Sequence, residues 1–387
     1  MSEMKIVVDQ RIPFVEEAFG SFGEILKYDS RAIDNAAVHD ADALLVRSET
    51  KVDEKLVAGS KLRFVGTATI GTDHVDLDAL RRNGVAFASA PGCNSNAVVQ
   101  YVFSALYTLG AREGFSLKGK TIGVVGVGNI GSKIVRVAQK LGMNVLKNDP
   151  PLYRSTGEPT FFPLDDLMSA DFITVHVPYT KRGPDPTHHL FDGERLSKMK
   201  RGAVLINSSR GAVVDNQALK RALAAGCPST AVLDVWENEP NIDLELLGQC
   251  ALGTQHIAGY SIDGKVNATR MIYSAFCSHF GLTPAWDAAS VIAPPSDPIM
   301  RINPGYTDPE KEISRLVREC YDITADDSKL RMVFELKEDE RGFYFKNLRG
   351  KYIFRYEFSN RTVTVTGKDS YLADVLTAFG FKTRYAN

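Results

Sequence analysis

Three side chains that together fit the oxidation of an alcohol lie in three polar segments: Arg210 in NSSRGAVVDN, Glu239 in LDVWENEP and His256 in GTQHIAGYS. Histidine titrates near neutral pH, so His256 is the best candidate to take a hydroxyl proton. A carboxylate on its other ring nitrogen would fix the tautomer, which suggests a Glu239–His256 pair. The guanidinium of Arg210 can bind a carboxylate with two parallel hydrogen bonds. The segments predict catalysis on a substrate with a hydroxyl and a carboxylate group.

Each of these residues follows an apolar run that we expect to form a strand, at 203–208, 231–236 and 251–257. Open α/β sheets bind ligands at the carboxyl ends of their strands, so the three positions agree with a shared site. Each residue also has a structural interpretation: a surface arginine in a turn, a solvated acid next to proline, and a hydrogen-bonded structural histidine.

The segment VVGVGNIGSKI places three glycines between a predicted strand and an amphipathic helix. Gly126 allows a tight turn, Gly128 leaves room where a pyrophosphate must approach the backbone, and Gly131 lets the helix pack closely on the strand. Asn129 and Ile130 complete the loop, and the following helix offers unpaired N–H groups to phosphates. The segment predicts a dinucleotide-binding loop.

Dinucleotide-binding loops of this kind are followed by an acidic residue that binds the adenosine ribose, and Asp149 is in that position. Asp149 ends the next predicted strand, at 143–149, about 20 residues after the first glycine. Its carboxylate can accept hydrogen bonds from the adenosine ribose and would repel a 2′-phosphate, so we expect NAD rather than NADP. The structural alternative is a tight turn followed by an exposed aspartate.

The elements that must position these residues alternate between strand and helix signals. Apolar runs at 4–8, 43–46, 63–66 and 85–89 precede a long helix at 94–110, and a second alternating series begins at 121. This rhythm predicts an α/β fold with two doubly wound parallel-sheet domains. We expect a flavodoxin-like substrate (lid) domain and a Rossmann-type NAD domain. The expected ranges are 1–93 with 263–290 for the first and 94–262 for the second.

The remaining chain changes character after a proline-rich crossing at 292–305. A charged helix at 308–323 and a final helix at 371–380 enclose two β-prone runs, at 342–348 and 351–358. We expect a small α+β domain over 291–387.

Composition excludes several classes of protein. The 387 residues are 44% hydrophobic and carry a net charge of −1, so no basic excess attracts nucleic acid. The apolar runs are shorter than the roughly 20 residues that span a bilayer, and five scattered cysteines form no C-x-x-C pair. The adjacent His188 and His189 have no acidic or cysteine partner at ligand spacing, so we expect no metal. We expect a cytoplasmic protein.

The blocks N-S-S-R-G-A-V-V-D, L-D-V-W-x-x-E-P and Q-H-I-A-G, after G-V-G-x-I-G, resemble the signature blocks of the D-isomer-specific 2-hydroxyacid dehydrogenases over about residues 1–290. The resemblance implies an active site in a cleft between two domains, with Arg210, Glu239 and His256 catalytic. The threonine that contacts the nicotinamide in that family is missing, with Val177 near its place. The NAD contacts that the resemblance implies are Asp149, Ser208, Ser209, Arg210, Asp234 and Gly259.

Further segments, among them VRSETKV, FVGTATIGTDHVD and YDITADDSKLR, resemble one branch of that family. Its members oxidise a phosphorylated four-carbon 2-hydroxy acid in pyridoxal phosphate biosynthesis and form homodimers through a C-terminal domain. The resemblance implies that Ser48, Thr69 and Tyr260 contact the substrate. For the substrate phosphate we expect Arg47 first, and then Arg349, which could reach the active-site cleft of a partner in the dimer.

Two alternatives stay open at this point. Another D-2-hydroxyacid dehydrogenase, such as one acting on D-3-phosphoglycerate, would use the same catalytic residues. An NAD(H)-sensing protein similar to the transcriptional corepressors of the family would also retain them. The C-terminal sequence and the absence of a disordered interaction segment argue against the second alternative.

Overall fold

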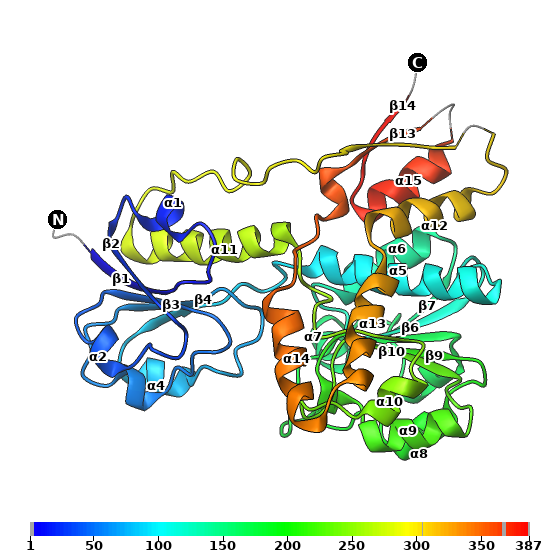
Figure 1. The fold of residues 1–387 in the computed structure, drawn as a ribbon, viewed down its shortest axis with the longest axis horizontal. Coiled ribbons are helices and arrows are strands. Elements are labelled where there is room, and N and C mark those ends of the chain that lie inside the picture. Colours follow the sequence, from blue (N-terminus) through cyan, green and yellow to red (C-terminus); the bar gives the residue numbers. More distant parts are fainter. Residues whose placement is uncertain (1–3, 304, 366–368, 386–387) are drawn as a thin grey trace. The chain divides into compact units, whose positions relative to one another are not determined.

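The computed structural model describes residues 4–303, 305–365 and 369–385 (Figure 1). The contacts within the chain divide it into two compact units, Met1–Asn94 with Ser261–Ala293 and Ser95–Tyr260 with Pro294–Asn387. We refer to these as the first and the second unit. The division places the last part of the chain in the second unit, so the separate domain expected over 291–387 stays a prediction, as do the other boundaries.

The first unit is built on a five-stranded parallel sheet with the strand order β2-β1-β3-β4-β5, which is the flavodoxin-like order. One face of this sheet packs against α1 and α11, and the other against the short helices α2, α3 and α4. The strands are β1 (Met4–Asp9), β2 (Gly23–Tyr28), β3 (Ala43–Val46), β4 (Phe64–Thr67) and β5 (Ala86–Ala88). The helices are α1 (Val15–Phe19), α2 (Asn35–Val38), α3 (Glu54–Val57), α4 (Leu77–Arg82) and α11 (Ile262–Phe280).

The sequence did not predict β2. Its residues, GEILKY, form the edge of the sheet and are only partly buried, so they carry no continuous apolar run. The strands β1, β3 and β4 inside the sheet are largely buried, and their apolar runs made them recognisable. The partly buried edge strand β5 was recognisable because it lies in the apolar run 85–89.

The second unit contains a six-stranded parallel sheet with the order β11-β10-β9-β8-β6-β7. An isolated parallel bridge between Lys147 and Phe161 extends it beyond β7, which completes the strand order of a Rossmann fold. Its strands are β6 (Thr121–Val125), β7 (Asn144–Asn148), β8 (Phe172–Val175), β9 (Val204–Asn207), β10 (Thr230–Leu233) and β11 (Leu252–Gly253). The α/β class with two doubly wound parallel sheets is confirmed.

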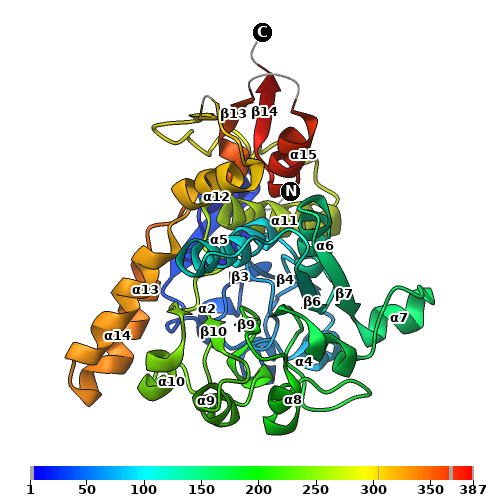
Figure 2. The same ribbon diagram turned by 90° about the vertical axis from the view of Figure 1, so that its right-hand side faces the viewer.

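Helix α5 (Ser95–Glu113) is buried along most of its length because two layers cover it. The six-stranded sheet lies on one side, α6 lies beside α5, and α12 (Pro309–Cys320) and α13 (Ile323–Arg331) of the C-terminal region pack on the other side (Figure 2). The other helices of this part are α6 (Gly131–Lys140), α7 (Pro150–Thr156), α8 (Gly193–Lys198), α9 (Asn216–Ala224) and α10 (Leu244–Gln249).

Residues 294–387, which we call the C-terminal segment, form a three-stranded parallel sheet of order β12-β13-β14 and several helices. The strands are β12 (Ile299–Arg301), β13 (Thr362–Val365) and β14 (Lys382–Tyr385). The helices are α12 (Pro309–Cys320), α13 (Ile323–Arg331), α14 (Glu338–Gly350) and α15 (Ser370–Phe379). A small C-terminal α+β region is therefore present.

The two β-prone runs of this segment are not strands. Residues 342–348 lie in α14, and residues 351–358 form no strand. Three acidic residues occupy the first turn of α14, and the Glu340 carboxylate accepts a hydrogen bond from the Lys337 N–H. These start signals, together with the packing of Phe345 in the core, outweigh the β propensity of the aromatic residues.

Among the residues that the structure describes, no helix combines the length and the apolar character needed to cross a membrane. The cytoplasmic location stays a prediction.

Candidate active site

The glycine loop lies between β6 and α6, where the sequence predicted it. Gly126 has φ of +86°, and a Cβ added there would lie 2.6 Å from the carbonyl oxygen of His176. A Cβ at Gly131 would overlap the carbonyl of Gly126. Gly128 is exposed and has no other atom within 4 Å of the position of a Cβ. The first and third glycines are thus required by packing, and the second leaves an open cradle that suits a pyrophosphate.

Asp149 ties the end of β7 to this loop. One carboxylate oxygen accepts the N–H of Val127 at 2.8 Å, and the other accepts the N–H of Leu152 at 3.0 Å and caps α7. Asn129 and Ile130 connect the loop to the start of α6. The carboxylate is held beside the glycine loop by two backbone donors, and its remaining lone pairs can accept ribose hydroxyls.

The turn that carries Arg210 follows β9 and is shaped by the side chain of Asn207. Its Oδ1 accepts hydrogen bonds from the backbone N–H and the hydroxyl of Ser209, at 3.1 and 2.8 Å, and its Nδ2 donates to the carbonyl of Arg210 at 3.0 Å. Within the described chain, the Ser208 hydroxyl is buried without a hydrogen-bond partner, so it has capacity for a ligand.

Glu239 and His256 form the predicted pair, from the loops that follow β10 and β11. The distance between Glu239 Oε2 and His256 Nδ1 is 2.9 Å, and Glu239 Oε1 accepts the N–H of Trp236 at 2.9 Å. Burial alone would raise the pKa of Glu239, but His256, the Trp236 N–H and Arg349 together hold the pKa below its usual value. The carboxylate is therefore ionised next to the imidazole.

The backbone that follows His256 is held by Asp234, which is 1% exposed. Its carboxylate accepts the N–H groups of Ile257 and Ala258 at 2.7 and 2.9 Å and the hydroxyl of Thr254 at 2.6 Å. His256 itself has φ of +60°, a left-handed conformation that needs such support. Asp234 thus has a structural role in the loop, which also contains Gly259. Its contact with NAD stays a prediction.

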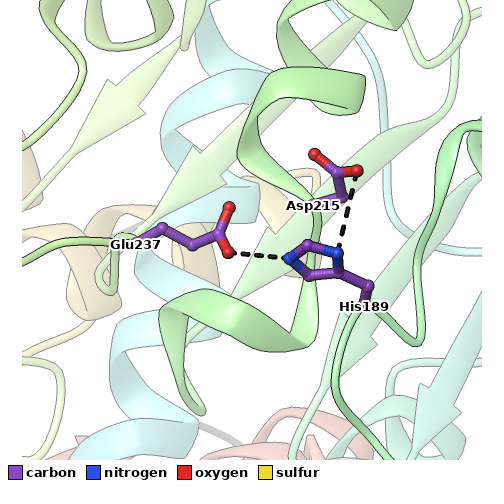
Figure 3. A group of neighbouring side chains, drawn as sticks. All are labelled: His189, Asp215 and Glu237. Carbon is purple, nitrogen blue, oxygen red and sulfur yellow. Dashed lines mark hydrogen bonds and ion pairs between the residues drawn. The ribbon is translucent and has the colours of Figure 1, made fainter.

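His189, Asp215 and Glu237 form a second group of neighbouring side chains, which we call the Glu237 cluster (Figure 3). His189 Nε2 lies 2.8 Å from Glu237 Oε1, and His189 Nδ1 lies 3.8 Å from Asp215 Oδ2. The other Glu237 oxygen accepts the N–H of Asn216 at 2.9 Å, and Asn216 Oδ1 accepts the N–H of Glu237 at 3.1 Å. The cluster joins the turn after Arg210 to the loop of Glu239.

The sequence has no acidic residue at ligand spacing from the adjacent histidines, but folding brings Asp215 and Glu237 to His189. The expected absence of a metal stays a prediction. These three residues are close enough to hold a metal ion. However, Figure 3 shows the carboxylates approaching different nitrogens of the ring, whereas a histidine ligand binds a metal through one nitrogen. The arrangement suits an imidazole that bridges two carboxylates.

Tyr260 and Arg349 lie together in the second unit. Arg349 Nε donates to the Tyr260 hydroxyl at 2.9 Å, and the guanidinium carbon lies 5.8 Å from the ring centre. Arg349 also acts electrostatically on Glu239. The structure therefore places Arg349 beside Tyr260 and near Glu239 of its own chain, whereas the sequence suggested a role in the cleft of a partner.

The remaining candidates lie on the first unit, at the carboxyl ends of β3 and β4. Ser48 is exposed. The Thr69 hydroxyl lies 2.8 Å from that of Thr67 and donates to a carbonyl at 3.0 Å. Arg47 Nε binds the carboxylate of Asp9 at 3.0 Å, and Asp9 is fully buried. This ion pair neutralises Arg47 and weakens the case for it as a phosphate ligand.

Comparisons with known proteins show what this chain is similar to. Residues 100–258 match the model of the D-isomer specific 2-hydroxyacid dehydrogenase, NAD binding domain. The erythronate-4-phosphate dehydrogenase of Azotobacter vinelandii is 44% identical over 97% of this chain and 99% of its own. That of Salinibacter ruber is 46% identical over 95% of each chain. The structure of a D-lactate dehydrogenase from Aquifex aeolicus, complexed with NAD and lactic acid, matches with a TM-score of 0.59 and 27% identity. The match covers 72% of this chain and 95% of the D-lactate dehydrogenase chain.

The C-terminal segment has its own match. Residues 295–380 fit the model of a domain of unknown function, DUF3410. The description of that domain assigns it no role.

Proposed function

Because this chain belongs to the D-isomer-specific 2-hydroxyacid dehydrogenase family, with erythronate-4-phosphate dehydrogenases among its full-length relatives, we propose that it oxidises 4-phospho-D-erythronate at C2 with NAD. The products are 2-oxo-3-hydroxy-4-phosphobutanoate and NADH, a step of pyridoxal phosphate biosynthesis. The single observation that carries the reaction type is the 2.9 Å hydrogen bond between Glu239 and His256. The names of the relatives support the choice of substrate.

In this mechanism His256 takes the proton of the C2 hydroxyl at Nε2, since Nδ1 faces Glu239. The ionised Glu239 stabilises the imidazolium that results. Arg210 holds the substrate carboxylate with parallel hydrogen bonds. The chemistry that NAD supplies when bound is acceptance of the hydride from C2.

The open space at Gly128 and the anchored carboxylate of Asp149 fit the pyrophosphate and the adenosine ribose of NAD. The residues that we propose to contact the cofactor are Gly126, Gly128, Asn129, Ile130, Gly131, Asp149, Ser208, Ser209, Arg210, Asp234 and Gly259.

For the substrate phosphate, the contacts favour Arg349 over Arg47. Arg349 is bound to the neutral hydroxyl of Tyr260, whereas Arg47 is paired with a buried carboxylate. A phosphate dianion binds best to a guanidinium that no carboxylate neutralises at close range. Tyr260 would donate or accept a hydrogen bond beside it. On the first unit, we propose Ser48 and Thr69 as further substrate contacts.

We also propose that the chain forms a homodimer through its C-terminal segment. Large apolar side chains are exposed there, among them Phe343 at 74% and Ile353 at 89%. Met332 and Phe334 are also exposed, at 56% and 43%. A contiguous surface of such side chains would be typical of one that another protein chain covers. Light scattering of the wild type should give the mass of two chains, and Phe343→Glu should shift it towards one.

The experiment that tests the reaction is a spectrophotometric assay of NADH formation on a panel of acids. We expect turnover of 4-phospho-D-erythronate and much weaker turnover of D-3-phosphoglycerate and of unphosphorylated erythronate. Preferred turnover of D-3-phosphoglycerate would support the alternative dehydrogenase. A protein that binds NADH but oxidises none of these acids would support the NAD(H)-sensing alternative.

A further inference from the structure

Arg355, in the C-terminal segment, donates to backbone carbonyl groups around the catalytic loop. Its Nη1 lies 3.2 Å from the carbonyl oxygens of Ile257 and Tyr260. Its Nη2 donates to the carbonyl of Ala97 at 3.1 Å and to that of Ala258. Three of these four carbonyls belong to the residues that follow His256.

The charge of Arg355 is accommodated by aromatic groups and a distant carboxylate. The guanidinium carbon lies 4.1 Å from the ring centre of Tyr321, and Nη1 lies 3.5 Å from the Tyr352 hydroxyl. Both tyrosine hydroxyls donate to Asp326, which is 4% exposed. Burying a guanidinium is unfavourable unless its donors are used. Here Nη1 and Nη2 are used on four backbone carbonyls, three of them in the loop after His256, whereas Nε is buried without a hydrogen-bond partner. Among the described residues, the guanidinium forms no direct ion pair with a carboxylate.

Asp234 holds the same loop through its N–H groups, whereas Arg355 holds it through its carbonyl groups. Its carboxylate takes the N–H groups of Ile257 and Ala258, while Arg355 takes the carbonyls of these residues and of Tyr260. Donors and acceptors of one short backbone stretch are thus fixed by two side chains of opposite charge. The stretch begins with His256, whose left-handed conformation depends on its surroundings.

We propose that Arg355 is a positioning residue that holds the loop of His256 and Tyr260 in the geometry for catalysis. This assigns a role in the active site to the domain of unknown function, in addition to any role in dimerisation. The inference rests on the proposed function for its kinetic test but not for its structural test.

Arg331 provides a matched control in the same segment. Its Nη1 and Nη2 donate to the carbonyls of Leu247 and Cys250, at 3.2 and 2.7 Å, and its Nε binds Asp327 at 2.9 Å. These carbonyls lie at the end of α10, which carries none of the catalytic residues. Arg331 and Arg355 therefore make the same kind of contact, on a loop without and a loop with catalytic side chains.

The test compares Arg355→Lys with Arg331→Lys. Lysine keeps the charge but cannot reach four carbonyls with a planar fork. We expect Arg355→Lys to lower kcat by about 10- to 100-fold, as for a small displacement of a catalytic group, with the KM for NAD within about twofold. In amide hydrogen exchange without substrate, residues 254–261 should exchange faster in this variant than in the wild type. Arg331→Lys should lower the melting temperature but leave kcat unchanged. Because Asp327, which Arg331 binds, also accepts the N–H of Gly253, the control is read at residues 256–261, where its exchange should equal that of the wild type.

A double-variant cycle separates positioning from general destabilisation. Arg355→Lys and Tyr260→Phe should each lower kcat/KM. If Arg355 acts through the loop, the fold-decrease in the double variant should be smaller than the product of the two single fold-decreases. Independent multiplication of the two effects, wild-type kcat in Arg355→Lys, or equal effects of both lysine variants would overturn the inference. If Arg355→Lys does not fold, Tyr352→Phe takes its place, with a fall in kcat of about threefold and faster exchange of the loop as the expected result. A wild type inactive on every acid would overturn the proposed function, and the exchange experiment would still decide the inference.

Discussion

The two members of the acid–base pair lie on neighbouring loops of one sheet edge, and the two loops are held in different ways. The Glu239 loop is fastened by Glu237, through Asn216 and His189, and all of these residues belong to the same alternating series of strands and helices. The His256 loop is fastened by Asp234 on one side and on the other by Arg355, which lies 97 positions after Ala258 in the sequence.

The positions of two paired side chains can thus depend on different kinds of support. Residues of the same strand and helix series hold the Glu239 loop, which we call the local support, and Arg355, which is distant in sequence, helps to hold the His256 loop, which we call the distant support. Gly211 adds to the local one, because a Cβ at this position would overlap the backbone of Trp236. The turn of Arg210 therefore packs directly on the loop of Glu239. The loops of Arg210 and Glu239 are supported within the part that matches the NAD-binding model, and the loop of His256 is held also by the C-terminal segment.

The largest effect is expected for His256→Ala, which removes the proton acceptor while leaving both loop supports in place. We expect kcat to fall by about 1,000-fold, within the range for loss of general base catalysis. The dissociation constant for NADH, measured by fluorescence titration, should not change because the glycine loop is intact. His188→Ala serves as the histidine control and should retain its activity. A loss of activity that is equal in the two variants would contradict the assignment.

Glu239→Gln tests whether the two loops work as one pair. The amide keeps the shape but no longer stabilises an imidazolium, so we expect a fall in kcat of about 100-fold. Residues that act as a unit are not additive, so the double variant with His256→Ala should be no slower than His256→Ala alone. A further decrease in the double variant would show that Glu239 acts independently of His256.

Breaking the local support should have a smaller effect than removing either catalytic group. Glu237→Ala removes the hydrogen bonds to His189 and Asn216, and we expect kcat to fall by about 10-fold through displacement of Glu239. Glu237→Gln, which can still accept from the Asn216 N–H, should recover part of this loss. Glu245→Gln is the control, since the Glu245 carboxylate is exposed and binds Lys220, which is outside the Glu237 cluster.

The same variants decide whether the Glu237 cluster holds a metal. We expect dialysis against EDTA to leave the kcat of the wild type unchanged. A loss of activity that Zn²⁺ restores in the wild type, but not in Glu237→Ala, would instead identify His189, Asp215 and Glu237 as metal ligands.

The sequence predicted the loops that the local support holds, but it did not predict the distant support by Arg355. Glycine spacing, apolar runs and polar residues at strand ends located the glycine loop and the Glu239–His256 pair, since these features depend on local geometry. The role of Glu237 was not predicted, although its segment was singled out. Arg355 lies in a run that suggested a strand, and only tertiary packing brings it to the His256 loop. No short-range pattern encodes a contact between a side chain and carbonyls so far away in sequence.

Asp149 extends the comparison to a third loop, in which one residue is both support and ligand. Its carboxylate holds the N–H of Val127 and caps α7, and we propose that it also binds the ribose of NAD. Asp149→Ala should raise the KM for NAD by about fivefold, the equivalent of one hydrogen bond of about 1 kcal/mol, and should weaken the rejection of NADP.

Asp192→Ala separates the two roles of Asp149, because Asp192 caps α8 through the N–H of Arg195 at 2.9 Å and lies outside the glycine loop. Loss of either cap should lower the free energy of unfolding by about 1 kcal/mol. Only Asp149→Ala should change the ratio of kcat/KM for NAD to that for NADP. An unchanged ratio with reduced stability would make Asp149 a support alone, and this loop would then resemble that of His256, where Asp234 fixes the backbone while another residue carries the chemistry.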